Sequence, residues 1–402
     1  MNENELLEIL HSSQHETDTY DFKERWENTN SELLKDILSF ANTAHHHDCY
    51  LIYGINDGKD VIGITDTDKN RKNQQNISDF LQSLNFANSS IPKVLVNTLE
   101  LENKLVDILT IKDSDQVPFY LKADYTKDGP ALRHGEIFFR DEDSNFGKQQ
   151  APTYETIESL WKKHFHLDLT PIEQFKFALK DIINWTYHEG DNEAPKMCVY
   201  NSNLDFHIEI SFDPSSSPTI EAFSVYQARV GVMWGTVRLK YKNILIYKFN
   251  CISLNQYICY EIDPKRSLLN ESDLNSLYFY LYANSIEKLT STVINYAMDY
   301  KTHVSPNESD YNFKKTIVVY SDEEERKRIE KDLKAKFSTK KALIPIYEAD
   351  VNELKQKMRL VEGHSNTDAQ ELIKEANIAR YINENYLHIN YYFGDHPFFP
   401  RY

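Results

Sequence analysis

Residues 15–23 read His-Glu-Thr-Asp-Thr-Tyr-Asp-Phe-Lys, and apolar and polar side chains alternate from position 19 onward. Alternation with a period of two predicts a β-strand over residues 19–23. Successive side chains of a strand point to opposite faces, so Asp21 and Lys23 would share one face of a sheet. Tyr20 and Phe22 would share the other face. The sequence therefore predicts a carboxylate and an ammonium group side by side.

An acid beside a lysine is an arrangement that many metal-dependent nucleases use. The carboxylate of Asp21 would hold Mg²⁺ or Mn²⁺, and Lys23 would orient water or neutralise charge that develops on a phosphate. Glu16 lies just before the strand, and Asp57 follows a continuous apolar run at residues 49–55 that predicts a buried neighbouring strand. Three carboxylates suit a hard cation better than zinc.

The same residues also allow a purely structural interpretation. Asp21 and Lys23 would then form a solvated ion pair on an exposed strand face. Asp57, which precedes Gly58, would be an ordinary turn residue. Spacing alone does not decide between the two interpretations.

The order of the predicted elements gives an α+β fold class. A mixed-sheet N-terminal domain is expected over residues 1–165, and a larger α+β C-terminal region over residues 171–402, with a further boundary near residue 305 left open. In the first region the periodicities predict helices at 5–9, 31–41, 77–84 and 154–165, and strands at 19–23, 49–55, 61–64, 94–99, 104–111 and 136–139. In the second they predict helices at 172–187, 272–300, 322–337 and 368–385, strands between 197 and 262, and strands at 316–320 and 342–347.

Composition limits the class of protein. The chain has 402 residues, of which 41% are hydrophobic and 27% charged, so collagen-like and disordered classes are excluded. No window offers the about 18 uninterrupted apolar residues of a membrane-spanning helix. The first ten residues are acidic and amphipathic rather than basic and then apolar, so a cytoplasmic location is expected. The net charge of −17 argues against a general nucleic-acid coating protein but allows a local site.

A series of short blocks occurs in one order between residues 10 and 165. The blocks are Glu16, Asp21-Phe22-Lys23, Leu38-Ser39-Phe40-Ala41-Asn42-Thr43, Leu51-Ile52-Tyr53-Gly54-Ile55-Asn56-Asp57, Val61-Ile62-Gly63-Ile64, Pro118-Phe119-Tyr120-Leu121-Lys122 and Glu136-Ile137-Phe138-Phe139-Arg140. This succession resembles the Schlafen AlbA-like domain. The resemblance implies a nucleic-acid-binding fold, and in some members a metal-dependent endoribonuclease that cuts transfer RNA or ribosomal RNA.

The resemblance also implies roles for individual residues. The three acids of the family's active site, which lie on a positively charged cleft, fall on Glu16, Asp21 and Asp57, and Lys23 matches the lysine two residues after the second acid. Two departures stand out. The family usually carries Glu at the position of Asp21, and it usually has a glycine pair where this chain has Ala-His-His-His-Asp at residues 44–48. The three histidines could act as metal ligands or proton donors, or form an exposed loop.

The function expected from these observations is that of an RNA endonuclease dependent on Mg²⁺ or Mn²⁺, with transfer RNA as the substrate that the resemblance implies, in a toxin or antiphage setting. A homodimer, or the second region, would complete the cleft. The alternative is a non-catalytic nucleic-acid-binding module or transcriptional regulator with a C-terminal sensor domain. Candidate phosphate contacts, each of which could equally belong to a solvated face, are Lys122, Arg140, Arg238, Lys240 and Lys242.

Overall fold

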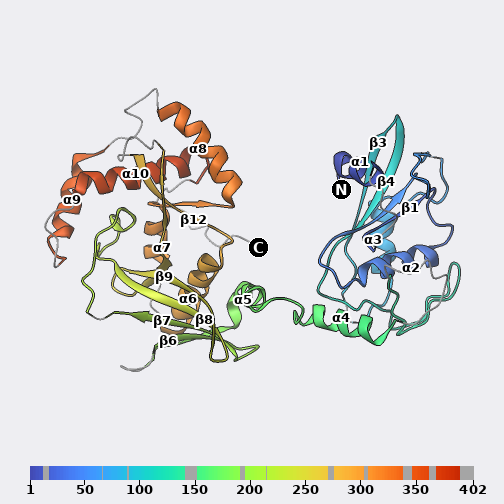
Figure 1. Ribbon diagram of the computed structural model, residues 1–402, viewed down its shortest axis with the longest axis horizontal. Helices are drawn as coiled ribbons and strands as arrows, with labels where there is room; N and C mark the ends of the chain where they lie inside the picture. Colours follow the sequence, from blue (N-terminus) through green and yellow to red (C-terminus); the bar gives the residue numbers. More distant parts are fainter. Residues whose placement is uncertain are drawn as a thin grey trace. The chain divides into compact units, whose positions relative to one another are not determined.

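The computed structural model describes residues 1–11, 18–65, 67–87, 90–140, 152–190, 195–213, 215–269, 276–302, 307–337, 346–361 and 368–389. The chain divides into two compact units, Met1–Thr170 and Pro171–Tyr402. In Figure 1 the first unit carries helices α1 to α4 and the second helices α5 to α10. Helices accompany mixed and antiparallel sheets, so the α+β class is confirmed. Among the described helices, none is long and apolar enough to cross a membrane.

The N-terminal unit is built on a four-stranded sheet with the strand order β1-β2-β4-β3. Strand β1 runs parallel to β2, whereas β2 pairs with β4 and β4 with β3 in antiparallel fashion. The elements are α1 (Glu3–His11), β1 (Tyr20–Lys23), α2 (Asn30–Ala41), β2 (Cys49–Tyr53), α3 (Gln74–Gln82), β3 (Val94–Leu101), β4 (Lys104–Ile111) and α4 (Tyr154–His164). Strand β1 is therefore an edge strand of the described sheet.

Helices cover both faces of this sheet. On one face Leu6 of α1 packs in a buried cluster with Tyr20 and Phe22 of β1. On the other face α2 and α3 bury their apolar residues against β2 and β4. The alternation predicted for β1 is confirmed, because Tyr20 and Phe22 lie in the α1 cluster while Asp21 and Lys23 face α2.

Two expectations for this unit are wrong in detail. Residues 136–139 form no strand, because none of the described strands pairs with them; the side chain of Asn42 donates to the backbone oxygen of Phe138 instead. Residues 61–64 form no strand either, since Val61 and Ile64 make only isolated bridges, to Ile55 and Leu105. Helix α2 is capped by Thr29, whose side chain accepts a hydrogen bond from the backbone of Glu32. The hydroxyl of Ser31 donates to the carbonyl of Pro130.

The C-terminal unit contains a six-stranded antiparallel sheet with the order β10-β9-β8-β7-β6-β5 and a three-stranded sheet with the order β11-β12-β13. Its elements are α5 (Pro171–Lys180), a 3₁₀ turn (Ile182–Asn184), β5 (Trp185–His188), β6 (Lys196–Tyr200), β7 (Phe206–Phe212), a second 3₁₀ turn (Ala222–Ser224), β8 (Met233–Tyr241), β9 (Ile244–Leu254), β10 (Cys259–Ile262), β11 (Lys265–Leu268), β12 (Leu277–Tyr282), α6 (Ile286–Thr302), α7 (Asn307–Lys314), β13 (Val318–Tyr320), α8 (Glu323–Phe337), α9 (Glu348–Met358) and α10 (Ala369–Asn385).

Helices α5 and α6 cover one face of the six-stranded sheet. Phe175 of α5 and Val293 of α6 share a buried cluster with alternate residues of the strands, such as Ile208 and Leu239. Strand β12 is buried on both sides, since Phe279 and Leu281 belong to one core cluster, and Tyr278 and Tyr280 to another.

Three expectations for the second unit need comment. The helix expected over 172–187 ends at Lys180, because residues 185–188 pair with β6 instead. The range 272–300 is not one helix: residues 277–282 form strand β12, and helix α6 begins at Ile286. The strand expected at 342–347 lies outside the described residues except for its last two positions.

Candidate functional site

Strand β1 places Asp21 and Lys23 next to each other, as the sequence predicts. The Nζ atom of Lys23 lies 3.0 Å from Oδ2 of Asp21 and 3.2 Å from Oδ2 of Asp36, which belongs to α2. Nη2 of Arg140 donates to Oδ1 of Asp21 at 2.8 Å. Both carboxylate oxygens of Asp21 are therefore bonded to cations. We call Asp21, Lys23, Glu27, Asp36 and Arg140 the β1 cluster.

Asn42 explains how Arg140 reaches β1 from a segment without secondary structure. Its Nδ2 donates to the backbone oxygens of Phe119 and Phe138, both at 2.9 Å, and its Oδ1 accepts from the backbone nitrogen of Phe119 at 2.6 Å. The guanidinium carbon of Arg140 lies 4.7 Å from the centroid of the Phe40 ring, which adds a cation–π contact. Blocks of sequence that are far apart in the chain are thus joined through one buried amide.

Burial and charge compete within the β1 cluster. Burial alone would raise the pKa of Asp21, but Lys23 and Arg140 together hold that pKa below its ordinary value. For Lys23, burial works toward a lower pKa and is outweighed by Asp36 and Asp21, which raise it. The pKa of Asp36 is raised because burial outweighs the attraction of Lys23. The ion pair at Asp21 is therefore ionised near neutral pH.

Asp36 and Glu27 are two acids of the β1 cluster that the sequence did not predict. The hydroxyl of Tyr53 donates to both carboxylate oxygens of Glu27, at 2.9 and 3.1 Å. Trp26 stacks on the Tyr53 ring with a centroid distance of 4.1 Å. Burial, with a further contribution from Asp36, raises the pKa of Glu27 to about 7. No pattern in the sequence marks either acid, because only the packing of α2 and the 24–29 connection on β1 brings them to Lys23.

The described residues include two of the three acids expected to bind a metal ion. Glu16 lies outside the described residues, and Asp57 is exposed in the turn after β2. Nowhere in the described ranges does a group of three or more His, Cys, Asp or Glu side chains have the geometry to hold a metal ion. The described residues supply carboxylate donors that suit a hard cation, but those of Asp21 are already bonded to Lys23 and Arg140. They do not by themselves form a metal site.

His45 and His46 contact separate partners. Nε2 of His45 lies 3.9 Å from Oδ2 of Asp18, and burial lowers the pKa of this histidine. Nε2 of His46 lies 2.7 Å from Oδ2 of Asp168. Lys163, which is 1% exposed, fixes the backbone of this loop by donating to the carbonyl oxygens of Thr43 and His45. The histidines therefore do not converge on one ion.

The remaining candidate cations differ in their surroundings. Lys122 is exposed, and Arg140 is paired with Asp21. Arg238 and Lys240 lie two residues apart on β8 and face the same side of the six-stranded sheet. Lys242 does not continue this alternation, because β8 ends at Tyr241 and Lys242 adopts a positive φ of 56° in the turn to β9.

Comparison with known proteins supports the resemblance seen in the sequence. The family model described as Schlafen, AlbA_2 matches residues 16–147. A search of curated proteins found no match to the chain. Among solved structures, the solution NMR structure of the N-terminal domain of a RecG-related protein from Nitrosomonas europaea shares 21% identity, covers 37% of this chain and 96% of its own, and gives a TM-score of 0.23. The N-terminal region therefore belongs to the Schlafen AlbA_2 family, as the order of its sequence blocks predicts.

Proposed function

We propose that the Schlafen AlbA_2 domain binds nucleic acid and acts as an RNA endonuclease that requires Mg²⁺ or Mn²⁺, with structured RNA of the transfer RNA class as its substrate. The family membership supports a nucleic-acid partner. The observation that carries the catalytic part is the pairing of Asp21 with Lys23 on an edge strand, beside Arg140. The side chains of Lys23 and Arg140 are 33% and 29% exposed, so a phosphate in solvent can reach them.

The residues of the β1 cluster have distinct roles in this proposal. Lys23 and Arg140 offset the negative charge that develops on the scissile phosphate. Asp21 holds both cations in position, so that little reorganisation is needed when RNA binds. Cleavage of an essential RNA by such a site would stop translation, which fits a toxin or antiphage role.

A binding module without hydrolysis is the second candidate. It is favoured by the saturation of Asp21, whose two carboxylate oxygens are both bonded to cations. The absence of a three-residue metal group from the described residues supports the same interpretation. In this case the cations of the β1 cluster would contact phosphates of the bound nucleic acid without any cleavage.

One experiment separates the two candidates. The full-length protein is incubated with total RNA and with purified transfer RNA in Mg²⁺, Mn²⁺ or EDTA, beside Asp21→Asn, Asp57→Asn and Lys23→Met variants. Asp79→Asn, which changes an exposed acid on α3 of the same unit, is the matched control. Circular dichroism checks that each variant is folded.

For the endonuclease we expect discrete fragments from the wild type and Asp79→Asn with metal, none in EDTA, and at least about a 100-fold slower reaction for Asp21→Asn and Lys23→Met. An equal loss in Asp57→Asn would show that the acid after β2 takes part in the reaction. Binding by the wild type without cleavage would establish the module instead. Equal cleavage by Asp21→Asn and the wild type would overturn the proposed role of the β1 cluster.

A further inference from the structure

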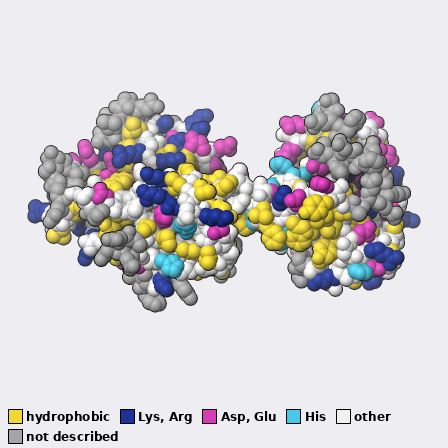
Figure 2. All heavy atoms as spheres, turned by 60° about the horizontal axis from the view of Figure 1, so that its bottom comes forward, with side chains coloured by type: hydrophobic (Ala, Val, Ile, Leu, Met, Phe, Trp, Pro, Cys, Tyr) yellow, Lys and Arg dark blue, Asp and Glu magenta, His cyan; other side chains and the backbone are white. Residues whose placement is uncertain are grey.

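The face of the six-stranded sheet that α5 and α6 leave uncovered carries a grid of polar side chains. Because side chains alternate along a strand, every second residue points into the buried core and the residues between them lie on this face. Figure 2 shows Lys and Arg side chains on the side of the C-terminal unit where Figure 1 places β6 and β7. On β7, β8 and β9 the polar residues of this face are His207, Glu209, Ser211, Thr236, Arg238, Lys240, Lys248 and Asn250.

Two cations face each other directly on this grid. Arg238 of β8 is the register partner of Lys248 of β9. Like charges opposite each other in a sheet are destabilising. Within the described part of the chain neither side chain forms an ion pair with a carboxylate; Nη1 of Arg238 donates instead to the hydroxyl of Ser211 at 2.8 Å. The nearby carboxylate of Glu209 is bonded to Lys240 at 2.6 Å. An anion placed between Arg238 and Lys248 would remove this repulsion.

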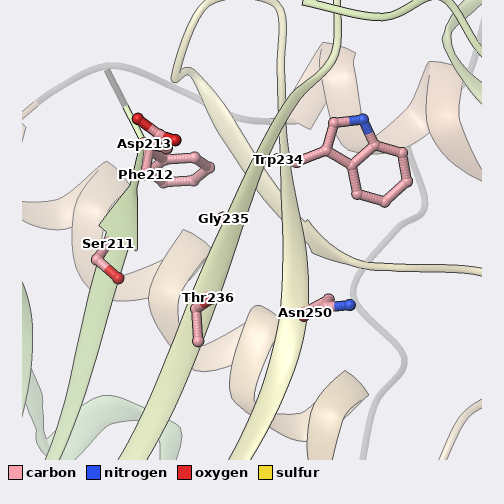
Figure 3. Close-up of a pocket in the computed structure, with 7 residues that line it drawn as sticks. All are labelled: Ser211, Phe212, Asp213, Trp234, Gly235, Thr236 and Asn250. Carbon is pink, nitrogen blue, oxygen red and sulfur yellow. The ribbon is translucent and has the colours of Figure 1, made fainter. Parts of the chain in front are cut away.

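A pocket adjoins the cation pair one row further along the sheet. It has a volume of about 420 Å³, and its rim carries Ser211, Thr236 and Asn250, which are register partners on β7, β8 and β9 (Figure 3). The next row adds Trp234, whose indole Nε1 donates to the hydroxyl of Thr219 at 2.8 Å. Hydroxyl and amide groups beside an aromatic wall suit the edge and face of a nucleobase.

Asp213 places a negative charge at one end of the pocket. It lines the pocket, and its Oδ1 accepts hydrogen bonds from the backbone nitrogen and the hydroxyl of Ser215 at 2.8 and 2.6 Å. A carboxylate repels phosphate but accepts a hydrogen bond from the exocyclic amino group of a base. The Asp213 end therefore suits a base, whereas Arg238 and Lys248 suit a phosphate.

Residues two apart on a strand are separated by about 6.6 Å, so the phosphate position and the base position lie within the span of a single nucleotide. We infer that this sheet face binds single-stranded RNA, with a phosphate between Arg238 and Lys248 and the adjoining base in the pocket of Ser211, Thr236 and Asn250. The strand must be single because a base that enters the pocket has to be unpaired. The choice of RNA as the ligand rests on the proposed function, and the sheet face would bind an unpaired segment of that RNA.

The test measures binding of a fluorescein-labelled, mixed-sequence single-stranded RNA of 12 nucleotides to the full-length protein by fluorescence anisotropy in EDTA, over a range of salt concentrations. We expect the Arg238→Gln/Lys248→Gln double variant to raise Kd about tenfold or more. The salt slope of the log of the affinity should become shallower by about 0.7, because the contact with one phosphate is lost. The Thr236→Val/Asn250→Ala double variant should raise Kd about 3- to 10-fold with an unchanged salt slope, because it loses base contacts only.

Lys176→Gln, which removes an exposed charge from α5 on the covered side of the sheet, is the control and should bind like the wild type. Equal Kd values for the wild type and both double variants would overturn the inference, as would equal losses in Lys176→Gln and the Arg238/Lys248 variant. Because EDTA prevents metal-dependent cleavage, failure of the nuclease proposal leaves these binding results unaffected. Conversely, a protein that cleaves RNA but binds equally well in all variants would retain the proposed function and lose the sheet-face site.

Discussion

Arg140 and Asp21, which are 119 residues apart in the sequence, are joined by a hydrogen bond of 2.8 Å between Nη2 and Oδ1. This contact links the last described segment before residue 141 to the edge strand of the sheet. It also completes the set of partners around Asp21, since Lys23 holds the other carboxylate oxygen.

We predict that Arg140→Gln lowers the free energy of unfolding by about 2 kcal/mol, because the buried carboxylate of Asp21 loses a charged hydrogen bond. The measurement is urea denaturation at neutral pH. Arg133→Gln is the control, since its guanidinium is 71% exposed and its pairing with Asp124 is worth little. Equal losses in the two variants would contradict a stabilising role of the Arg140–Asp21 pair.

We predict a pH dependence of stability that originates at Glu27. Its pKa is about 7 in the folded protein against an ordinary value of 4.5, so the folded state binds the proton more tightly. The stability should therefore fall as the pH rises from about 4.5 to 7, by about 3 kcal/mol, and then stay level.

The Glu27→Gln variant carries no ionisable group at this position and keeps a hydrogen-bond acceptor for Tyr53. The comparison is urea denaturation of the wild type and the variant at intervals between pH 4.5 and 8. The difference in unfolding free energy between the two proteins should grow in favour of the variant across this window. A constant difference would show that Glu27 titrates normally.

We predict that Asn42→Ala destabilises the N-terminal unit by about 3 kcal/mol or more. The substitution leaves the carbonyls of Phe119 and Phe138 and the nitrogen of Phe119 without their side-chain partner, and buried unpaired groups cost about 1–3 kcal/mol each. Thermal and urea denaturation measure the loss. Asn97→Ala, an exposed position on β3, should cost less than about 1 kcal/mol. A similar cost at both positions would show that the Asn42 network contributes little.

We predict that Lys163→Met loosens the loop at residues 43–48. The ammonium group donates to the carbonyl oxygens of Thr43 and His45 at 3.0 and 2.5 Å and to Asp113 at 2.6 Å, none of which a thioether can replace. Amide hydrogen exchange of the loop should accelerate about tenfold or more. Lys162→Met, at an exposed neighbour, should leave the exchange unchanged. Unchanged exchange in the Lys163 variant would refute the role of this lysine.

Local sequence patterns predicted those helices and strands in which buried residues recur at a regular spacing. The stripe of Leu33, Leu34, Ile37 and Leu38 defines the buried face of α2, and these residues are indeed almost fully buried. Strand β12 was missed because its run Leu-Tyr-Phe-Tyr-Leu-Tyr is apolar at every position, and a fully buried strand of this kind cannot be told from a buried helix by periodicity. Only pairing with β11 and β13 decides it.

The family of the N-terminal region, the alternation that puts Asp21 beside Lys23, and the α+β class can all be predicted from the amino-acid sequence, because each depends on residues that are close in the chain or on the order of short blocks. The positions of Asp36, Glu27 and Arg140 around this pair, and of Arg238 opposite Lys248, become visible only in the folded protein. Such contacts depend on how helices pack and strands register, and these are set by the burial of distant apolar residues rather than by any local pattern.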